Sequence, residues 1–428
     1  MIGVLFTVGL SLSSVSSVDW PQFQGPDRNG KVDLSGVDFD WSEGGPEISW
    51  KVDVGKGYGG AAVQGGEVFL LDRIVGERDI LRVMDLATGE EKWSVDYEAP
   101  GRLNFPGSRT VPTVTKKYVY TMGGFGRLHC FSRKTQDVAW SVNLEEVYGG
   151  QMPTFGWSAA PVIVDDLVIV TPLGEDVGIV AFDRMTGDEV WIAEGLGYSH
   201  STPALLTLHG RRQLLFMSTV GVGMGQDQAT PTTISSFDPA DGSLIWRHDT
   251  MLTGLPIPAP VQIDDERFFV TGGYRGGSTM MHIAKEGSEY SLEEVFHIDR
   301  GAQIHLPLLH EEHLYLIVNE NWNNSRARQS EGGLLCLSLD GEEVWRTGAD
   351  PFLGRGNSIL AGGYLLIQDG HNGVLRVVEP TTAGFELIAE ANLFEIDDRS
   401  DHEMWATMAL SDGRLLIRSH EQMLCVKL

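Results

Sequence analysis

A short string ending in tryptophan recurs along the chain, and it constrains the fold more than any other feature. The copies read MDLATGEEKW, FSRKTQDVAW, FDRMTGDEVW, FDPADGSLIW and LSLDGEEVW, and they end at Trp93, Trp140, Trp191, Trp246 and Trp345. Each has an apolar strand end, a polar turn such as Thr-Gly or Asp-Gly, and a second strand, which is typical of a β-hairpin. Counted from Trp50, the first four intervals are 43, 47, 51 and 55 residues. Repeats of about 40 to 50 residues are the size of one four-stranded propeller blade.

A second recurring unit lies between these hairpins: an apolar pair, a polar turn and an apolar run. Examples are PTVTKKYVYTM from Pro112, PVIVDDLVIVT from Pro161 and MALSDGRLLI from Met408. We interpret it as strands a and b of a blade and the tryptophan hairpin as strands c and d. Eight first hairpins can be counted, and two blades without the tryptophan keep the frame around Phe296 and Leu387. The sequence therefore predicts an all-β, eight-bladed propeller of four-stranded antiparallel blades.

The two ends of the repeat array predict how the ring closes. The segment EISWKVDV carries Trp50 and has no strands a to c before it, whereas QMLCVKL is a strand c with nothing after it. We expect residues 46–54 to pair with 421–428, so that an N-terminal strand d completes the last blade and leaves no open sheet edge. Residues 18–428 then form a single propeller.

The connections between strands divide into two sets. With strand a innermost, the d-to-a and b-to-c connections share one face of the ring, and the long ones, such as YEAPGRLNFPGSR and LEEVYGGQMPTFGW, belong to this set. We call it the long-loop face. Binding residues usually lie on long loops of a rigid scaffold.

The first residues and the net charge limit location and partners. The apolar run from Ile2 to Leu12 is too short to span a bilayer, and Val15 and Ser17 suit a cleavage motif, so residues 1–17 are expected to be a signal peptide. No later stretch predicts a transmembrane helix. The formal net charge of −27 disfavours nucleic acid as a partner. We expect a periplasmic or secreted monomer.

The pattern of Asp, Thr-Gly and terminal Trp resembles the tryptophan-docking motif of pyrroloquinoline-quinone-dependent (PQQ-dependent) dehydrogenase propellers. The segment DWPQFQGPDRNG at Asp19 to Gly30 resembles the start of exported, noncatalytic bacterial propellers of this PQQ-like repeat type, and the likeness spans residues 19–428. It also relates the chain to the scaffold propeller of outer-membrane protein assembly. The resemblance implies that the repeat tryptophans stack on neighbouring blades: Trp50, Trp93, Trp140, Trp191, Trp246 and Trp345.

The dehydrogenases of this type hold a quinone, a calcium ion, a catalytic Asp and, in many members, two adjacent cysteines. Cys130, Cys336 and Cys425 are instead at one equivalent strand c position in three blades. We expect buried thiols there, without a disulfide or metal role. No cofactor, metal site or catalytic residue is predicted, and PQQ with calcium enters only under an enzymatic alternative.

Aligning the residues that precede strand a identifies a candidate inner ring. It contains Tyr58, Arg109, Ser158, His200, Ile257, Ile304, Arg355 and Trp405, with His305 next to it and Glu403 just upstream. The ligand-binding interpretation selects Tyr58, Arg109, His200, His305, Arg355, Glu403 and Trp405 as a channel mouth suited to a planar anion, with arginine forming bidentate bonds. The competing interpretation is a water-filled channel whose polar residues satisfy strand-end backbone groups.

Three functions remain open from the sequence. The first is a noncatalytic exported propeller that binds a protein or small ligand on its long-loop face. The second is a quinoprotein oxidoreductase dependent on PQQ and calcium. The third is a carbohydrate- or polymer-binding module that stacks its ligand on aromatic loop residues, namely Trp322, Tyr148, Phe155 and Trp157.

Overall fold

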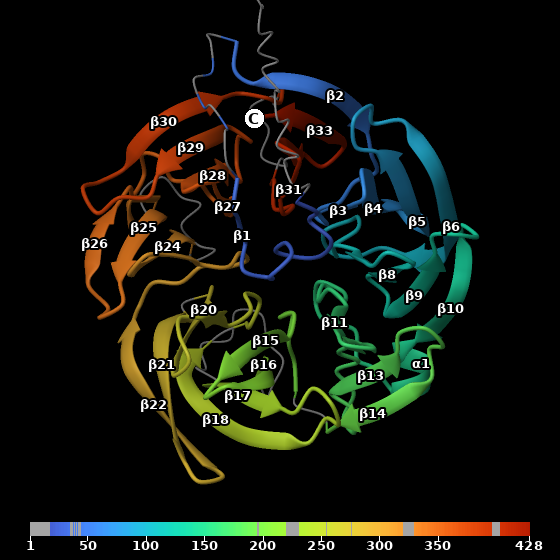
Figure 1. Ribbon diagram of the computed structural model, residues 1–428, viewed down its shortest axis with the longest axis horizontal. Helices are drawn as coiled ribbons and strands as arrows, with labels where there is room; N and C mark the ends of the chain where they lie inside the picture. Colours follow the sequence, from blue (N-terminus) through green and yellow to red (C-terminus); the bar gives the residue numbers. More distant parts are fainter. Residues whose placement is uncertain are drawn as a thin grey trace, which may run out of the picture.

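The computed structural model describes residues 18–34, 37, 39, 41, 44–194, 197–219, 231–253, 255–274, 276–319, 329–395 and 403–428. Within them the chain forms eight antiparallel sheets arranged in a ring (Figure 1). The helical part is α1 (Leu144–Tyr148) and the short 3-10 turn η1 (Gln329–Glu331). The predicted all-β, eight-bladed propeller is confirmed.

We number the blades along the chain. Blade 1 contains β3 (Ala62–Gln64), β4 (Glu67–Ile74), β5 (Gly76–Asp85) and β6 (Glu91–Gly101); blade 2, β7 (Thr113–Val114), β8 (Tyr118–Met122), β9 (Arg127–Ser132) and β10 (Asp137–Asn143); blade 3, β11 (Val162–Val164), β12 (Leu167–Val170), β13 (Ile179–Asp183) and β14 (Glu189–Ala193); and blade 4, β15 (Ala204–Leu208), β16 (Arg211–Thr219), β17 (Pro231–Phe237) and β18 (Leu244–Thr253). Blade 5 contains β19 (Val261–Gln262), β20 (Arg267–Gly272), β21 (Gly277–Glu286) and β22 (Glu289–Ile298); blade 6, β23 (Leu308–His310), β24 (His313–Val318), β25 (Gly333–Ser338) and β26 (Glu343–Arg346); blade 7, β27 (Asn357–Ala361), β28 (Tyr364–Gln368), β29 (Leu375–Glu379) and β30 (Glu386–Ala391); and blade 8, β31 (Ala409–Ser411), β32 (Arg414–Arg418), β33 (Gln422–Lys427) and β2 (Glu47–Asp53).

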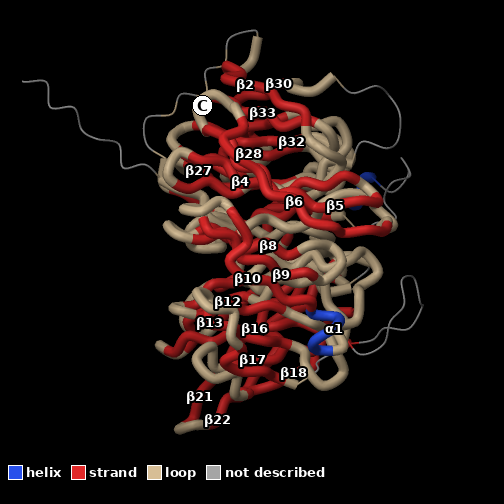
Figure 2. The backbone as a smooth tube through the Cα atoms, turned by 90° about the vertical axis from the view of Figure 1, so that its right-hand side faces the viewer, coloured by secondary structure: helices blue, strands red, loops and turns tan. Residues whose placement is uncertain are grey.

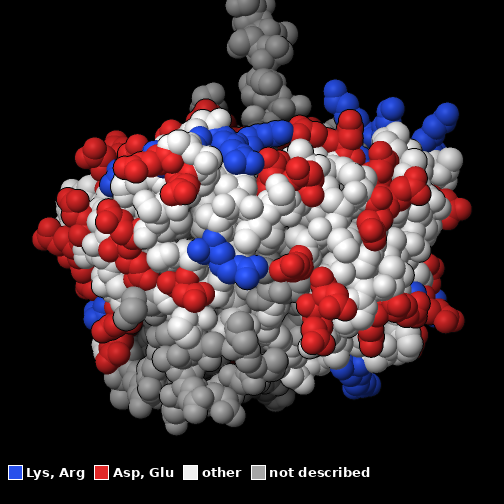
Figure 3. All heavy atoms as spheres, turned by 90° about the horizontal axis from the view of Figure 1, so that it is seen from below, with Lys and Arg blue, Asp and Glu red and all other residues white. Residues whose placement is uncertain are grey.

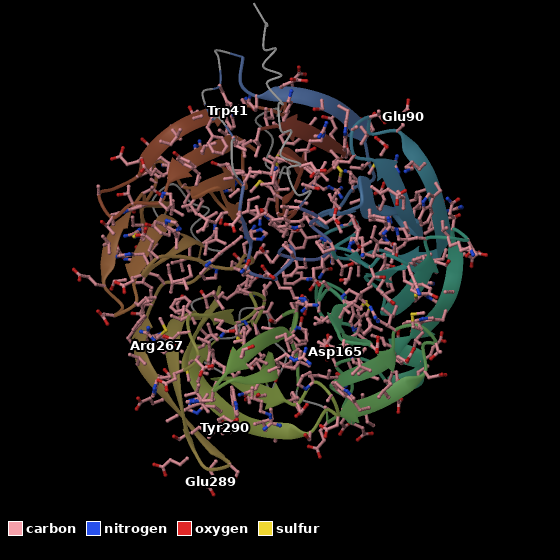
Figure 4. The ribbon with its side chains drawn as sticks, in the orientation of Figure 1. Trp41, Glu90, Asp165, Arg267, Glu289 and Tyr290 are labelled. Carbon is pink, nitrogen blue, oxygen red and sulfur yellow. The ribbon has the colours of Figure 1, made fainter. Side chains whose placement is uncertain are left out.

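The burial pattern of a strand follows its distance from the axis. The middle strands are packed on both faces by neighbouring blades, so β12 (LVIV) and β24 (HLYLIV) are nearly continuous apolar runs. The outer strand β22 alternates between exposed and half-buried residues because one of its faces meets water. Figure 4 shows the same arrangement: Asp165, in an a-to-b turn, lies inside the ring, while Glu90 and Glu289, at c-to-d turns, lie at the periphery.

The ring closes through β2 and β33. They pair antiparallel from Glu47 with Lys427 to Asp53 with Gln422, and Trp50 lies opposite Cys425. This pairing is consistent with the closure expected from the two ends of the repeat array. Blade 8 is thereby built from segments that are more than 350 residues apart in the sequence.

Truncation of the chain after Glu421 tests how much stability depends on this closure. Removing β33 leaves β2 without its partner and exposes the apolar residues of β32, so we expect loss of a single cooperative unfolding transition and a lower melting temperature. Calorimetry of the truncated and full chains measures both. A truncated chain that unfolds like the full one would show that closure is dispensable.

The repeat tryptophans reach from one blade to the next. The indole N–H of Trp50 donates to the carbonyl oxygen of Leu86 at 2.9 Å, that of Trp191 to Pro239 at 3.2 Å, and that of Trp345 to Thr381 at 2.8 Å. Each acceptor lies in the c-to-d turn of the following blade. Trp246 differs, because its indole donates to Gln213 of its own blade at 2.7 Å.

A turn glycine makes room for the tryptophan ring. At Gly89 (φ +73) an added Cβ would lie 2.7 Å from the ring of Trp50, and at Gly242 (φ +73) it would lie 2.4 Å from Trp191. Positive φ and a ring packed against the backbone both favour glycine at these positions. The Thr-Gly and Asp-Gly turns of the repeat are therefore one half of an interblade contact, and the tryptophan of the preceding blade is the other half.

The structure corrects the frame of blade 7. Val378 pairs with Leu387 and Val377 with Ala389, with a bulge between them, so the position equivalent to the docking tryptophan is Ala389. Leu387 is 44% exposed. Phe39 is buried, packs against Tyr364 with ring centroids 5.1 Å apart, and lines a hollow together with Ala389.

Substitution of Trp191 by alanine is expected to destabilise the fold by about 3 to 5 kcal/mol, since a large buried ring and its hydrogen bond are lost together. Leu387→Ala is the matched control on another outer strand and should cost little, because its side chain is largely exposed. Chemical denaturation of both variants measures the difference. Equal stabilities would contradict a docking role for Trp191.

The N-terminal segment, residues 18–34, crosses the propeller axis. Trp20 pairs with Val63 of β3, the amide of Val114 donates to the Pro21 carbonyl, and Arg28 donates to the Ile163 carbonyl at 2.6 Å. Strand β1 (Lys31–Val32) then joins β27 in parallel, as seen inside the ring in Figure 1. These contacts lie beside the a-to-b turns of four blades, so the segment plugs the channel at the short-turn end. The segment thus lies in the predicted channel at this end, and the interpretation of the inner-ring polar residues as the lining of a water-filled channel stays a prediction.

The outer surface of the ring is acidic, and the three thiols are buried. Carboxylates are spread over the wall of the ring in Figure 3, in keeping with the net charge of −27. Cys130, Cys336 and Cys425 are buried and unpaired, as expected, and burial raises the pKa of Cys130 and Cys425 to about 12. Among the described residues, no helix has the length and apolar character needed to cross a membrane.

Candidate functional site: an axial cavity on the long-loop face

A cavity of about 280 Å³ lies on the propeller axis, where the residues preceding strand a converge from all eight blades. The inner-ring alignment identified eight of its lining residues: Tyr58, Arg109, Ser158, His200, Ile257, Ile304, Arg355 and Trp405. His305 also lines the cavity. Glu403 does not, but it contacts Arg355. The structure thus brings all seven predicted ligand-binding residues together, while their role in binding stays a prediction.

The plug decides which way the cavity faces. Phe23, from the N-terminal segment, lines the cavity at the end nearer the short turns. The other end is bordered by d-to-a connections, including Phe105, which is 36% exposed. Figure 2 shows α1, part of one such connection, on that flank of the ring. A ligand would therefore enter from the long-loop face.

Aromatic rings form one wall of the cavity. Trp405 lies 4.8 Å from Tyr58 and 5.0 Å from Phe105 between ring centroids, and Phe155 lies 5.7 Å from Phe105. These side chains come from connections into blades 8, 1, 2 and 3. Such a continuous aromatic surface offers stacking area to a flat apolar group.

Arg109 brings a positive charge into the cavity wall. Its Nε donates to the Phe155 carbonyl and its Nη1 to the Gly107 carbonyl at 3.1 Å, while Nη2 is buried without a hydrogen-bond partner. Burial lowers the pKa of Arg109 to about 10, so the group remains cationic at neutral pH. No carboxylate of the described residues forms an ion pair with it.

Arg355 is held differently. Its Nη1 donates to Glu403 Oε2 in an ion pair, and its Nε donates to Gln303 Oε1 at 2.9 Å. The guanidinium also lies over the Trp405 ring, 4.9 Å from its centroid. Glu403 therefore compensates the charge of Arg355 and fixes its position against the aromatic wall.

His305 is neutral and presents a donor. Asn357 Oδ1 accepts from the Met408 amide at 2.9 Å, so the Asn357 Nδ2 group is the one that donates to His305 Nδ1 at 3.1 Å. The ring proton must then be on Nε2, which is buried without a partner. Burial lowers the pKa of His305 to about 4, so the ring is neutral at pH 7.

Ser158 and His200 form a pair that resembles a nucleophile and its base. Ser158 Oγ lies 2.9 Å from His200 Nδ1, and His200 Nε2 lies 2.9 Å from the Tyr198 hydroxyl. Burial, with a contribution from Arg109, lowers the pKa of His200 to about 3. A base this weak is poorly matched to proton abstraction at neutral pH. The pair is suited to holding the loops in place.

Comparison with known proteins gives the family. A family model described as outer membrane protein assembly factor BamB matches residues 76–224 and 231–427. The chain belongs to this family. It is 26% identical to the outer membrane protein assembly factor BamB of Shewanella oneidensis over 159 residues, and 28% identical to the dehydrogenase subunit of a quinone alcohol dehydrogenase of Komagataeibacter europaeus over 163 residues. These matches cover 34% and 35% of this chain, 36% of the assembly factor and 21% of the dehydrogenase subunit.

Solved structures support the fold. The quinohemoprotein alcohol dehydrogenase from Comamonas testosteroni superposes with a TM-score of 0.66 at 13% identity, covering 95% of this chain and 80% of that one. A europium-containing methanol dehydrogenase gives a TM-score of 0.52 at 10% identity, covering 93% of this chain and 89% of that one. Identities this low establish the architecture alone.

The dehydrogenase resemblance implies a quinone and calcium, and the described lining can be tested against them. Calcium takes about six to eight oxygen ligands, several of them carboxylates. The carboxylate nearest the cavity among the described residues is that of Glu403, which is bound to Arg355, and the described residues contain no group of three or more His, Cys, Asp or Glu able to hold a metal. The described lining therefore lacks the set of carboxylate ligands that a calcium ion takes.

Sequence alignment missed several lining residues. Phe105 lies in a d-to-a connection of irregular length, Phe23 lies in the plug, and Gln303 and Tyr274 lie outside the aligned position. None of these four residues lies at a position that the inner-ring alignment compares between repeats. Of the proposed stacking platforms, Trp157 is 1% exposed and donates to the Thr171 carbonyl, so the expectation of exposure is wrong. Tyr148 bonds to Glu189 at 2.7 Å, and Trp322 lies outside the described residues.

The buried histidines predict acid sensitivity. In the unfolded chain His305 takes up a proton near pH 6.5, whereas in the folded chain it does so only near pH 4. Its contribution to stability is therefore complete above about pH 6.5 and is lost as the pH falls toward 4. His305→Gln should flatten the dependence of unfolding free energy on pH across this window by up to about 1.4 kcal/mol per pH unit.

Denaturant titrations at several pH values between 4 and 7 measure this slope. His371→Gln is the control, since His371 is exposed. An unchanged slope in His305→Gln would mean that His305 is protonated in the folded protein well above pH 4.

Proposed function

We propose that this protein is an exported, noncatalytic binding propeller of the assembly-factor family. It takes a small ligand, or a projecting side chain of a partner protein, into the axial cavity on its long-loop face. The observation that carries the proposal is the cavity itself: all eight blades supply its wall, a plug residue lines it, and Arg109 is a half-buried cation that pairs with no carboxylate of the described residues.

Export is part of the proposal. It is supported by the resemblance of residues 1–17 to a signal peptide and by membership in a family described as an outer membrane protein assembly factor. A mature chain isolated from the producing cell is expected to begin near Val18.

The second candidate is a quinoprotein oxidoreductase, favoured by the dehydrogenase relative. It differs from the first in needing a divalent cation beside the quinone, and Glu403, a described carboxylate beside the cavity-lining Arg355, is engaged in an ion pair with that arginine. The carbohydrate-binding alternative is weakened by the burial of Trp157.

Calorimetric titration of the mature chain with PQQ in calcium buffer, followed by a dye-linked alcohol oxidation assay, separates the first two candidates. We expect no calcium-dependent binding and no turnover. Saturable binding that requires calcium and supports turnover would overturn the noncatalytic proposal. Glu403→Gln is the informative variant in that case, because it removes the carboxylate nearest the cavity.

A further inference from the structure

We propose that the ligand of the axial cavity is a small aromatic monocarboxylate. This inference rests on the proposed function and deepens it by naming the class of ligand. It follows from three independent properties of the described lining: the kind of hydrogen-bonding atoms left unsatisfied, the number of uncompensated charges, and the shape of the apolar wall.

The unsatisfied atoms on the cavity-lining side chains are donors. Arg109 Nη2, Trp405 Nε1 and His305 Nε2 are buried without a hydrogen-bond partner, and the tautomer set by Asn357 places the proton on His305 Nε2. A buried donor without a partner is costly to the folded state. The two strongest acceptors nearby, Glu403 Oε2 and Gln303 Oε1, already accept from Arg355. A ligand that supplies acceptor atoms would remove this cost.

The charge count points to a single negative charge. Two arginines border the cavity, and Glu403 compensates one of them, Arg355. His200 and His305 are neutral. One cation, Arg109, therefore remains. A ligand with several negative charges would find a single compensating cation inside a chain of net charge −27. A monoanion matches the count, and arginine suits a carboxylate because its two N–H groups can bind both oxygens.

The shape favours a ring of modest size. The cavity of about 280 Å³ is at the small end for ligand sites. Tyr58, Phe105 and Trp405 form a cluster with centroid separations of 4.8, 5.0 and 6.1 Å. A flat apolar body can stack on these rings while its carboxylate reaches Arg109, whose guanidinium lies 5.9 Å from the Tyr58 ring centroid.

The test uses three probes of matched size, namely 3-phenylpropionate, its neutral amide and 3-phenylpropylamine, together with the smaller propionate. Calorimetric titration of the mature full chain at pH 7 should show saturable binding of 3-phenylpropionate. The amide should bind about tenfold more weakly or worse, since it loses a charge-assisted pair. The amine should not bind measurably, and propionate should bind weakly because it has no ring to stack.

Arg109→Gln should lower the affinity for 3-phenylpropionate by about tenfold or more and leave the amide nearly unchanged. Arg267→Gln is the matched control, because Arg267 lies near the rim of the ring and pairs with Asp264 away from the cavity (Figure 4). Phe105→Ala, at a partly exposed position, should weaken binding of the aromatic acid without changing that of propionate. Circular dichroism and melting temperatures establish that each variant folds.

The outcomes distinguish a wrong ligand class from a wrong binding site and from a wrong function. Equal or tighter binding of the amide or the amine would overturn the anionic ligand class and keep the cavity as a binding site. Binding of 3-phenylpropionate that survives Arg109→Gln would place the site elsewhere and overturn the inference. No binding of any probe at millimolar concentration would also overturn it, whereas calcium-dependent PQQ binding with turnover would overturn the noncatalytic function itself.

Discussion

The ring of eight sheets closes because β2, from the N-terminal part of the chain, completes blade 8 by pairing with β33 at the C-terminal end. The other features of the molecule depend on this long-range pairing. Closure removes open sheet edges and sets the radius at which eight strand a ends meet. The docking tryptophans act near the outside of the same ring, where Trp50, Trp191 and Trp345 each bond to the c-to-d turn of the next blade.

The plug formed by residues 18–34 makes the two ends of the axial channel different. Without residues 18–34 the eight inner strands would border a passage open at both ends. Trp20, Pro21, Arg28 and β1 instead contact four different blades beside their short turns. Phe23 of this segment lines the axial cavity together with the polar and aromatic residues at the start of each strand a. Further along the chain, the buried Phe39 lines a hollow together with Ala389, the small residue at the docking position of blade 7.

The electrostatics of the cavity contrast with those of the surface. The chain is strongly acidic overall, yet the lining carries one compensated and one uncompensated arginine and two histidines that burial keeps neutral. Most polar groups of the lining are bonded within the protein, and the donors left without a partner are Arg109 Nη2, Trp405 Nε1 and His305 Nε2. Unpartnered donors in a folded protein favour a ligand that carries acceptor atoms. Binding of such a ligand recovers the free energy that desolvation of these donors costs.

The sequence by itself determined the repeat, the number of blades, the closing strands and the inner-ring positions. Each blade repeats the same alternation of apolar strands and glycine turns. The period therefore places equivalent residues at the same distance from the axis. It also identified the docking tryptophans and the buried thiols, since Trp50 and Cys425, opposite each other across β2 and β33, occupy repeat-equivalent positions. The plug and the floor formed by Phe23 were decided only by tertiary structure, as were the pairing of Glu403 with Arg355 and the tautomer of His305. These features join residues from segments that share no repeat position, so the repeat pattern does not predict them. Only the folded ring brings Asn357 to His305 and leaves Arg109 without a carboxylate.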